Sequence, residues 1–310
     1  MSAIPRGPLC MFKNLVLFRV ASGDSCFELS VIEASLAKSP FEPCGPTQER
    51  SIGWVPPRGE KHGALVEAIN GQLICRAMVE TKAVPASAIA RKLEERVEML
   101  LQQTGRKPGK KELKELKEEI RLSMLPYAIP KLATCWVWLA PQAGYLYIDA
   151  STQSRVDDLV SLLVELVPGL SVAQLATNLA PAAAMSSWLS TQEPPSSFTV
   201  DRECELKTPD DSKSAVRYAR HALDIAEIQG HIQAGKVPTR LAITWDDRVS
   251  FVLTDKLQLR KVDYLDTVFD GRDSDRGVFD SDFAIATGEI ERLVPDLVQA
   301  LGGELASASR

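Results

Sequence analysis

Basic side chains gather in two regions of a chain that is acidic overall. Its 310 residues include 36 Lys and Arg against 41 Asp and Glu, for a formal net charge of -5. In the segment 104–111, TGRKPGKK, the basic residues are Arg106, Lys107, Lys110 and Lys111. In the region 213–240, the candidates are Arg217, Arg220, His221, Lys236 and Arg240. Dispersed clusters without a glycine-rich cradle suit a polyanion better than a small anion.

The sequence lacks the motifs of proteins that read a nucleotide sequence. It has no paired Cys and His of a zinc finger, no aromatic RNP motif and no compact recognition-helix unit. Any binding to nucleic acid should therefore be directed at phosphates and be nearly indifferent to sequence. The alternative for each cation is an ordinary surface charge, since such charges are abundant on soluble proteins.

One segment has the spacing of a phosphate loop, GHIQAGKV at 230–237. Val237 stands where a Ser or Thr would bind magnesium. The segment is also predicted to run from a helix into a strand, whereas a phosphate loop runs from a strand into a helix so that helix-start amides face the phosphate. The segment therefore does not predict an ATP site.

The sequence also lacks the common motifs of hydrolytic enzymes. The sequence has no GxSxG, no HExxH and no metal-binding pair of Cys and His. An aspartate-rich run from Asp263 to Asp282 could supply a two-metal site in principle. Aspartates in glycine-containing turns more commonly cap and solubilise such turns. The residues themselves therefore point to no catalytic residue, no bound metal and no cofactor.

The element that must position the first cluster is the stretch 86–126. Apolar residues recur at helical spacing on either side of the turn, which Gly105, Pro108 and Gly109 interrupt. This pattern predicts a helical hairpin with a basic tip. Residues 86–125 contain ten Lys and Arg against seven Glu, so the sign of the charge is reversed relative to the whole chain. The alternative is a charged, solvated helical pair.

In the second cluster, Arg217, Arg220 and His221 are predicted to lie on a basic helix over 214–234, and Lys236 and Arg240 follow it. Further helices are expected over 28–37, 64–69, 155–167 and 289–301. Strands are expected over 12–20, 72–80, 134–140, 145–150, 241–245, 249–253, 257–264 and 283–287. The proline-rich segment 40–60 around Trp54 is predicted to lack regular structure. These elements indicate an α+β protein with antiparallel sheets and a projecting helical arm.

Charge, cysteine usage and hydropathy restrict the class of protein and its cellular compartment. From 246 to 300 there are thirteen Asp and Glu against seven Lys and Arg, so this part is acidic. The six cysteines are scattered without a CxxC pair, which favours reduced, mostly buried thiols. No apolar run reaches the roughly 18 residues of a membrane helix. The first ten residues lack the apolar stretch of a secretory signal, so we expect a cytoplasmic protein.

Several motifs, taken together, resemble the RdgC family of bacterial recombination-associated proteins. They are FKNLVLFRV near the start, FEPCG and GWVPP around Trp54, NGQLIC, the helical arm ending in SMLP, HIQAGKVPTRLAITW, FDSDFAIATGEI and LGGE. The resemblance is collinear from about Met11 to Glu304. The first ten residues look like an addition, and 127–129 departs from the basic residue and Phe of the family.

The resemblance implies a non-enzymatic DNA-binding protein, with a crescent-shaped subunit whose homodimer closes into a ring around duplex DNA. It implies binding with little sequence preference, association with the nucleoid, and restraint of RecA-mediated recombination. Whether single-stranded DNA is bound as well is left open by the resemblance. A ring can keep acidic groups outside while its inner wall carries the cations. The nine basic residues named above are the candidates for that wall. The alternative is a regulator that contacts recombination proteins directly, with DNA contact secondary.

We divide the sequence into five parts. A flexible N-terminal extension covers 1–10, and the first part of a central α/β region covers 11–85. The basic helical arm covers 86–126. A region of hairpin, helix and connector follows over 127–212, and a C-terminal α/β region covers 213–310.

Overall fold

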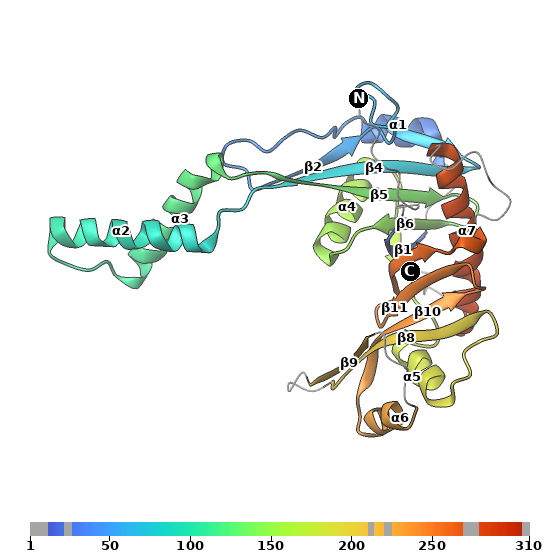
Figure 1. The fold of residues 1–310 in the computed structure, drawn as a ribbon. Helices are drawn as coiled ribbons and strands as arrows, with labels where there is room; N and C mark the ends of the chain where they lie inside the picture. Colours follow the sequence, from blue (N-terminus) through green and yellow to red (C-terminus); the bar gives the residue numbers. More distant parts are fainter. Residues whose placement is uncertain (1–11, 22–26, 210–213, 220–224, 269–278, 306–310) are drawn as a thin grey trace. The chain divides into compact units, whose positions relative to one another are not determined.

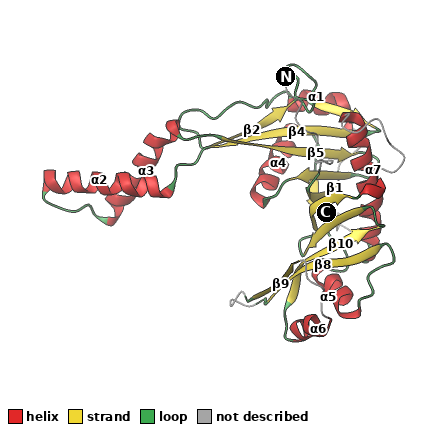
Figure 2. Cartoon of the chain, in the orientation of Figure 1, coloured by secondary structure: helices red, strands yellow, loops and turns green. Residues whose placement is uncertain are grey.

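The computed structural model describes residues 12–21, 27–209, 214–219, 225–268 and 279–305. The strands are β1 (Asn14–Val20), β2 (Arg50–Val55), β3 (Val66–Ile69), β4 (Gln72–Thr81), β5 (Lys131–Ala140), β6 (Tyr145–Asp149), β7 (Val172–Gln174), β8 (Phe198–Lys207), β9 (Ala215–Ala219), β10 (Val237–Trp245), β11 (Val249–Thr254) and β12 (Gln258–Tyr264). The helices are α1 (Leu29–Leu36), α2 (Ala86–Thr104), α3 (Lys110–Met124), α4 (Gln153–Leu166), α5 (Pro181–Thr191), α6 (Ile225–Gln233) and α7 (Phe279–Ala300). The protein is therefore α+β (Figures 1 and 2). The predicted extension 1–10 lies outside the described residues.

The chain divides into two compact units. The sheet unit comprises residues 1–36, 56–75 and 136–310, and the arm unit comprises residues 37–55 and 76–135. Strands β4 and β5 each continue from one unit into the other. The two groups of predicted site residues therefore belong to different units.

The sheet unit is built on a large antiparallel sheet. Its strands follow the order β5-β6-β1-β12-β11-β10-β8-β9, with β7 beside β1. The predicted hairpin of 134–140 and 145–150 is confirmed as β5 and β6, which pair from Trp136 opposite Asp149 to Ala140 opposite Tyr145. The sheet brings residues from opposite ends of the chain together, since β1 pairs with β12.

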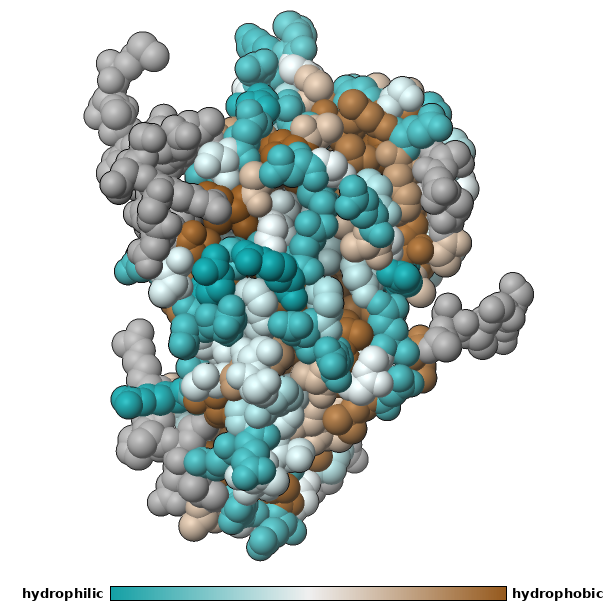
Figure 3. All heavy atoms as spheres, turned by 90° about the vertical axis from the view of Figure 1, so that its right-hand side faces the viewer, coloured by the Kyte–Doolittle hydropathy of each residue, from teal (hydrophilic) through white to brown (hydrophobic). Residues whose placement is uncertain are grey.

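One face of this sheet is apolar and is covered by α5 and α7. Leu241 and Leu259 belong to one buried cluster with Trp188 of α5 and Leu293 of α7. Helix α7 runs beside the strands (Figure 1). Seen from the side of α7, the surface mixes hydrophilic and hydrophobic residues (Figure 3). Because α5 and α7 bury this face, polar side chains of these strands must lie on the other face.

Strand β1 differs from the strands further along the sheet because it is buried on both faces. Four successive residues, Leu15 to Phe18, are buried. Successive side chains of a strand point to opposite faces, so both faces must be covered there. In β12, by contrast, the burial pattern leaves Arg260 and Lys261 accessible between buried neighbours. This change marks where the second face of the sheet becomes open.

The arm unit contains the predicted helical pair as α2 and α3. Gly105 ends α2 with a left-handed φ of +69°, and Gly109 precedes α3 in an extended conformation. Ile89 is buried in α2 and Ile120 in α3. Leu101 and Leu122, in contrast, remain exposed. The two helices therefore bury only part of their apolar surface.

Three of the predicted elements are wrong. The segment 64–69 is not helical but forms β3, which turns at Asn70 and Gly71, both with positive φ, and pairs with β4. Asn-Gly between two apolar runs is a strong hairpin signal. Residues 283–287 form no strand but lie within α7, where Phe283 and Ala286 face the core. Trp54 lies in β2 and is 1% exposed, so the proline-rich segment contains regular structure.

The predicted basic helix over 214–234 is also wrong. Residues Ala215–Ala219 form β9, paired antiparallel with β8, and only Ile225–Gln233 is helical. In β9 the half-buried Val216 and Tyr218 alternate with the exposed Arg217. That alternation is the signature of a strand rather than a helix, and Arg217 therefore lies on β9 and not on a helix.

Candidate nucleic-acid interface

The open face of the sheet begins on β8, where charged and buried residues alternate. Glu203, Glu205 and Lys207 lie on one side of the strand, while Cys204 and Leu206 are fully buried on the other. Strand β8 lies between β10 and β9. The period of two therefore directs a row of charges onto the face that α5 and α7 leave uncovered.

Two β-bulges add further polar groups to this face. Strand β10 has one extra residue between Pro238 and Arg240 relative to β8. Strand β12 has one extra residue opposite the step from Ser250 to Val252, and Lys261 there has a φ of +52°. A bulge interrupts the alternation of side chains. Consecutive residues can consequently share one face, and Arg260 and Lys261 of β12 both line one hollow.

These strands line a hollow of about 550 Å³ on the open face. Its cationic residues are Lys207, Arg240, Lys256, Arg260 and Lys261. Its acidic residues are Glu203, Glu205 and Asp255. Neutral polar groups, among them Asn14, Ser151 and Thr254, complete the lining. A concave polar surface with an excess of positive charge suits a phosphate backbone.

Part of the positive charge is already neutralised by carboxylates. Lys261 Nζ donates to both oxygens of Glu203, at 2.7 and 2.8 Å. Arg217 of β9 reaches the same carboxylate, with Nη2 3.5 Å from Oε1. Lys207 Nζ lies 2.6 Å from Glu205 Oε1. The hydrogen bond from Lys261 lowers the pKa of Glu203, and that from Lys207 lowers the pKa of Glu205, so both acids are ionised at neutral pH.

Other cations of the hollow are not held in this way. Among the described residues, Arg240 and Lys256 form no ion pair, and both side chains are exposed. Arg260 is partly buried and donates to Gln258 Oε1 and to the carbonyl oxygen of Ala150, each at 3.1 Å. Burial, followed by the nearby charge of Arg240, lowers the pKa of Arg260. An arginine remains protonated at neutral pH after a moderate lowering of its pKa. Arg240, Lys256 and Arg260 are therefore the ready donors of this face, that is, cations not held by a carboxylate and available to a phosphate.

The basic turn predicted on the arm is present between α2 and α3. Lys107, Lys110 and Lys111 are exposed. Arg106 Nη1 donates to Glu112 Oε2 at 3.1 Å, and the same oxygen accepts the N–H of Gly109 at 3.4 Å. An acid from the first turn of α3 thus neutralises one of the four cations of this turn.

The second predicted group is only partly brought together. Arg217 and Arg240 reach the open face through β9 and β10. Lys236 lies in the turn before β10, and its Nζ is 3.1 Å from His231 Nδ1. Arg220 and His221 lie outside the described residues.

Three cations of the hollow were missed because they belong to the segment that is acidic overall. Lys256, Arg260 and Lys261 come from the β11–β12 turn and from β12. The run QLRKV contains a strand pattern, but a strict period of two would place Arg260 and Lys261 on opposite faces. The bulge could not be inferred from that pattern. The sequence pattern also misses Lys207, because it predicts a connector where the structure has β8.

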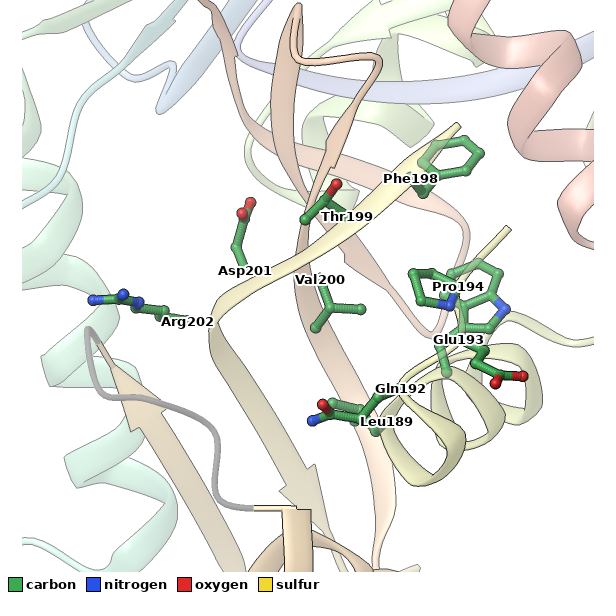
Figure 4. Close-up of a pocket in the computed structure, with 10 residues that line it drawn as sticks. Leu189, Gln192, Glu193, Pro194, Phe198, Thr199, Val200, Asp201 and Arg202 are labelled. Atoms are coloured by element: carbon green, nitrogen blue, oxygen red, sulfur yellow. The ribbon is translucent and has the colours of Figure 1, made fainter. Parts of the chain in front are cut away.

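A second hollow of about 630 Å³ lies between the end of α5 and the start of β8 (Figure 4). Trp188, Leu189 and Phe198 supply its apolar side, with the Trp188 and Phe198 rings stacked. Arg202 is the cation of this lining, and its side chain extends away from that of Phe198 (Figure 4). Glu193 and Asp201 also line it, so this hollow suits a phosphate less well than the one on the open face.

Other chemistry is weakly supported by the described residues. Gly230 lies within α6 and Val237 begins β10, so the GxxxxGK segment runs from helix to strand as predicted. No group of three or more His, Cys, Asp or Glu side chains in the described part of the chain could hold a metal ion. Cys44, Cys75, Cys135 and Cys204 are buried thiols that belong to no disulfide. Within the described ranges, no helix is both long and apolar enough to cross a membrane.

Comparison with known proteins identifies the family. A family model described as "Putative exonuclease, RdgC" matches residues 10–304. The chain belongs to the RdgC family. The resemblance seen in the sequence motifs is thereby confirmed over nearly the same range.

Three relatives that match nearly the whole chain share one name. Proteins named "Recombination-associated protein RdgC" are 38% identical in Dechloromonas aromatica, 40% in Herminiimonas arsenicoxydans and 41% in Cupriavidus pinatubonensis. The alignments cover 94–96% of this chain and 98–99% of the relatives. These names refer to recombination and to no enzymatic activity, whereas the description of the RdgC model refers to an exonuclease.

Proposed function

We propose that this protein binds double-stranded DNA through its phosphates, without sequence preference, and restrains RecA-mediated recombination without being an enzyme. The observation that carries the proposal is the hollow on the open face of the sheet, where Arg240, Lys256 and Arg260 are not paired with a carboxylate in the described structure. Membership of a recombination-associated family supports DNA as the polyanion.

Phosphate binding fits the composition of this face better than base reading does. The cations come from β8, β10 and β12 and from the β11–β12 turn, so they form a broad charged surface rather than a row on one element. Reading bases in the major groove usually needs a helix or a two-stranded ribbon inserted into the groove. Contacts to phosphates position a protein on DNA but carry no direct sequence information.

In the proposed assembly two copies close into a ring, with the open faces and the basic turns of the arms toward an enclosed duplex. Two copies facing one duplex would double the local positive potential while acidic surfaces remain outside. Two measurements test the assembly. The mass of the protein in solution gives its oligomeric state, and its retention on linear and on closed circular DNA is compared at high salt. A dimer that is retained on circular DNA at high salt but slides off linear DNA supports encirclement. A monomer with equal retention on both refutes it.

DNA binding itself is tested by measuring affinity against salt concentration for several unrelated duplexes. Phosphate contacts give a linear fall of log K with log salt, with a slope of about -0.9 for each neutralised phosphate. We expect a steep slope and equal affinities for all sequences. A flat slope, or strong preference for one duplex, contradicts the proposal.

A second candidate function is regulation through direct contact with a recombination protein. The observation that favours it is a group of exposed apolar residues in the arm unit, where Tyr127, Ile129 and Leu132 are 87%, 84% and 61% exposed. Exposed apolar groups of this size commonly mark interaction sites. If a variant with Ser at all three positions binds DNA normally but no longer inhibits strand exchange, direct protein contact is the main activity.

The non-enzymatic part of the proposal is tested with end-labelled DNA. We expect no release of nucleotides when the purified protein is incubated with magnesium or manganese. If the labelled DNA becomes shorter with time, and this activity co-purifies with the protein, the protein has the exonuclease activity to which the family description refers.

A further inference from the structure

Two carboxylates of β8 line the surface that should bind phosphate. Glu203 and Glu205 line the same hollow as the five cations, with side-chain exposures of 27% and 13%. They are two residues apart on β8 and therefore point to the same face. An acid in a phosphate-binding surface repels the ligand, so its presence there requires a physical account.

We propose that Glu203 and Glu205 act as an internal competitor for DNA, holding Lys261, Arg217 and Lys207 in ion pairs that a phosphate must displace. This inference rests on the proposed DNA-binding function and adds a residue-level control of its affinity. In consequence the face divides into ready donors, such as Arg240 and Lys256, and donors that are already occupied.

The geometry favours competition over simple solubilisation. Glu203 accepts from Lys261 through both of its oxygens and also lies near Arg217, so one carboxylate neutralises part of the charge of two cations. Glu205 is anchored a second time, because Thr239 Oγ1 donates to its Oε1 at 3.0 Å. A carboxylate held at two points cannot swing away easily when a phosphate arrives. The competing charge therefore remains close to the binding surface.

Competition has a signature in the salt dependence of binding. DNA affinity depends on salt because each cation that neutralises a phosphate releases counterions from the DNA. An occupied lysine that stays with its carboxylate releases none, so it does not contribute to the slope. Removing the carboxylate charge should both tighten binding and steepen the slope, whereas a general change in net charge should alter the slope little.

The experiment compares Glu203→Gln, Glu205→Gln and the double variant with the wild-type full-length protein. Glutamine keeps the shape of glutamate and can still accept the hydrogen bond of Thr239. Binding to one duplex is measured by fluorescence anisotropy over a range of salt concentrations. Glu165→Gln is the matched control, because Glu165 is exposed on α4 and does not line the hollow.

We expect each single variant to bind about 1.5- to 5-fold tighter at low salt, the range for breaking a partly exposed ion pair. The slope should become steeper by about one for each lysine released. Glu165→Gln should match the wild type in slope. Binding by Glu203→Gln that is equal to or weaker than that of Glu165→Gln overturns the inference, since the acid would then have no effect or would position Lys261 for the phosphate.

A second comparison keeps the test valid if a glutamine variant folds poorly. In the wild-type background, Lys261→Ala combined with Glu203→Ala should cost less affinity than Arg240→Ala, because the first variant removes an occupied donor together with its acid, whereas Arg240 forms no ion pair among the described residues. Equal losses contradict the inference. If neither alanine variant weakens binding, the face does not contact DNA and the proposed function fails instead, so the two failures are distinguishable.

Discussion

Removing two cations of the hollow that are not ion-paired should weaken DNA binding by an amount that depends on salt in a calculable way. The variant is Arg240→Ala with Lys256→Ala, both exposed and without an ion pair among the described residues. If each contacts one phosphate, the slope of log K against log salt should become shallower by about 1.8. Raising salt fourfold, from about 50 to about 200 mM, should then shrink the affinity deficit of the variant about twelvefold.

The assay is fluorescence anisotropy with two unrelated duplexes of equal length, at four or more salt concentrations. The loss should be the same for both duplexes because phosphates carry no sequence information. Lys38→Ala with Lys61→Ala is the charge-matched control, since both lysines are exposed and lie outside the hollow. A deficit that is constant with salt, or that the control reproduces, would refute the assignment of the open face as the phosphate contact.

Three further predictions concern stability. Gly53→Ala should lower the free energy of unfolding in urea by about 1–3 kcal/mol, because an added Cβ would lie 2.4 Å from the Cα of Phe41 in the preceding loop. An unchanged urea midpoint would show that this loop moves to accommodate the methyl group. Trp138→Phe should cost about 1–3 kcal/mol by removing the buried hydrogen bond from its Nε1 to Gln72 Oε1 at 2.8 Å, and Trp136→Phe is the comparison that keeps that bond. The double Gln variant of Glu203 and Glu205 should be less stable than the wild type at pH 7. Because the folded-state pKa values of both acids are lowered, this stabilisation is present above the unfolded pKa of about 4.3 and is lost as pH falls through the lowered values; a stability gap that persists at pH 2 would contradict this cause.

Local patterns were sufficient where a segment carries its own signal. The arm illustrates this point, because the spacing of leucines with Gly105 and Gly109 predicts two helices and a basic turn, which are α2, α3 and their connection. The hairpin of β5 and β6 follows equally from aromatic and β-branched runs around a turn. In each case the residues that decide the structure are neighbours in sequence.

Prediction failed where a short segment fits two periods. In 215–219 the arginine and the apolar residues fit a helical wheel, but pairing with β8 supplies backbone hydrogen bonds that select the strand. Phe283 and Ala286 look like part of a strand, yet they lie three apart on α7 and face the core. Tertiary contacts outweigh weak local preference in both segments.

The sequence by itself determined the family, the α+β class and the helical pair with its basic turn. These follow from motifs, periodicity and the local density of charge, all of which are properties of neighbouring residues. Only the tertiary structure decided which cations share a surface. Strand pairing and two bulges bring Lys207, Arg240 and Lys261 to one hollow, and they place Glu203 and Glu205 among them. Charge counted along the chain cannot reveal this, because electrostatic interaction depends on distance in space and on shared desolvation rather than on separation in sequence.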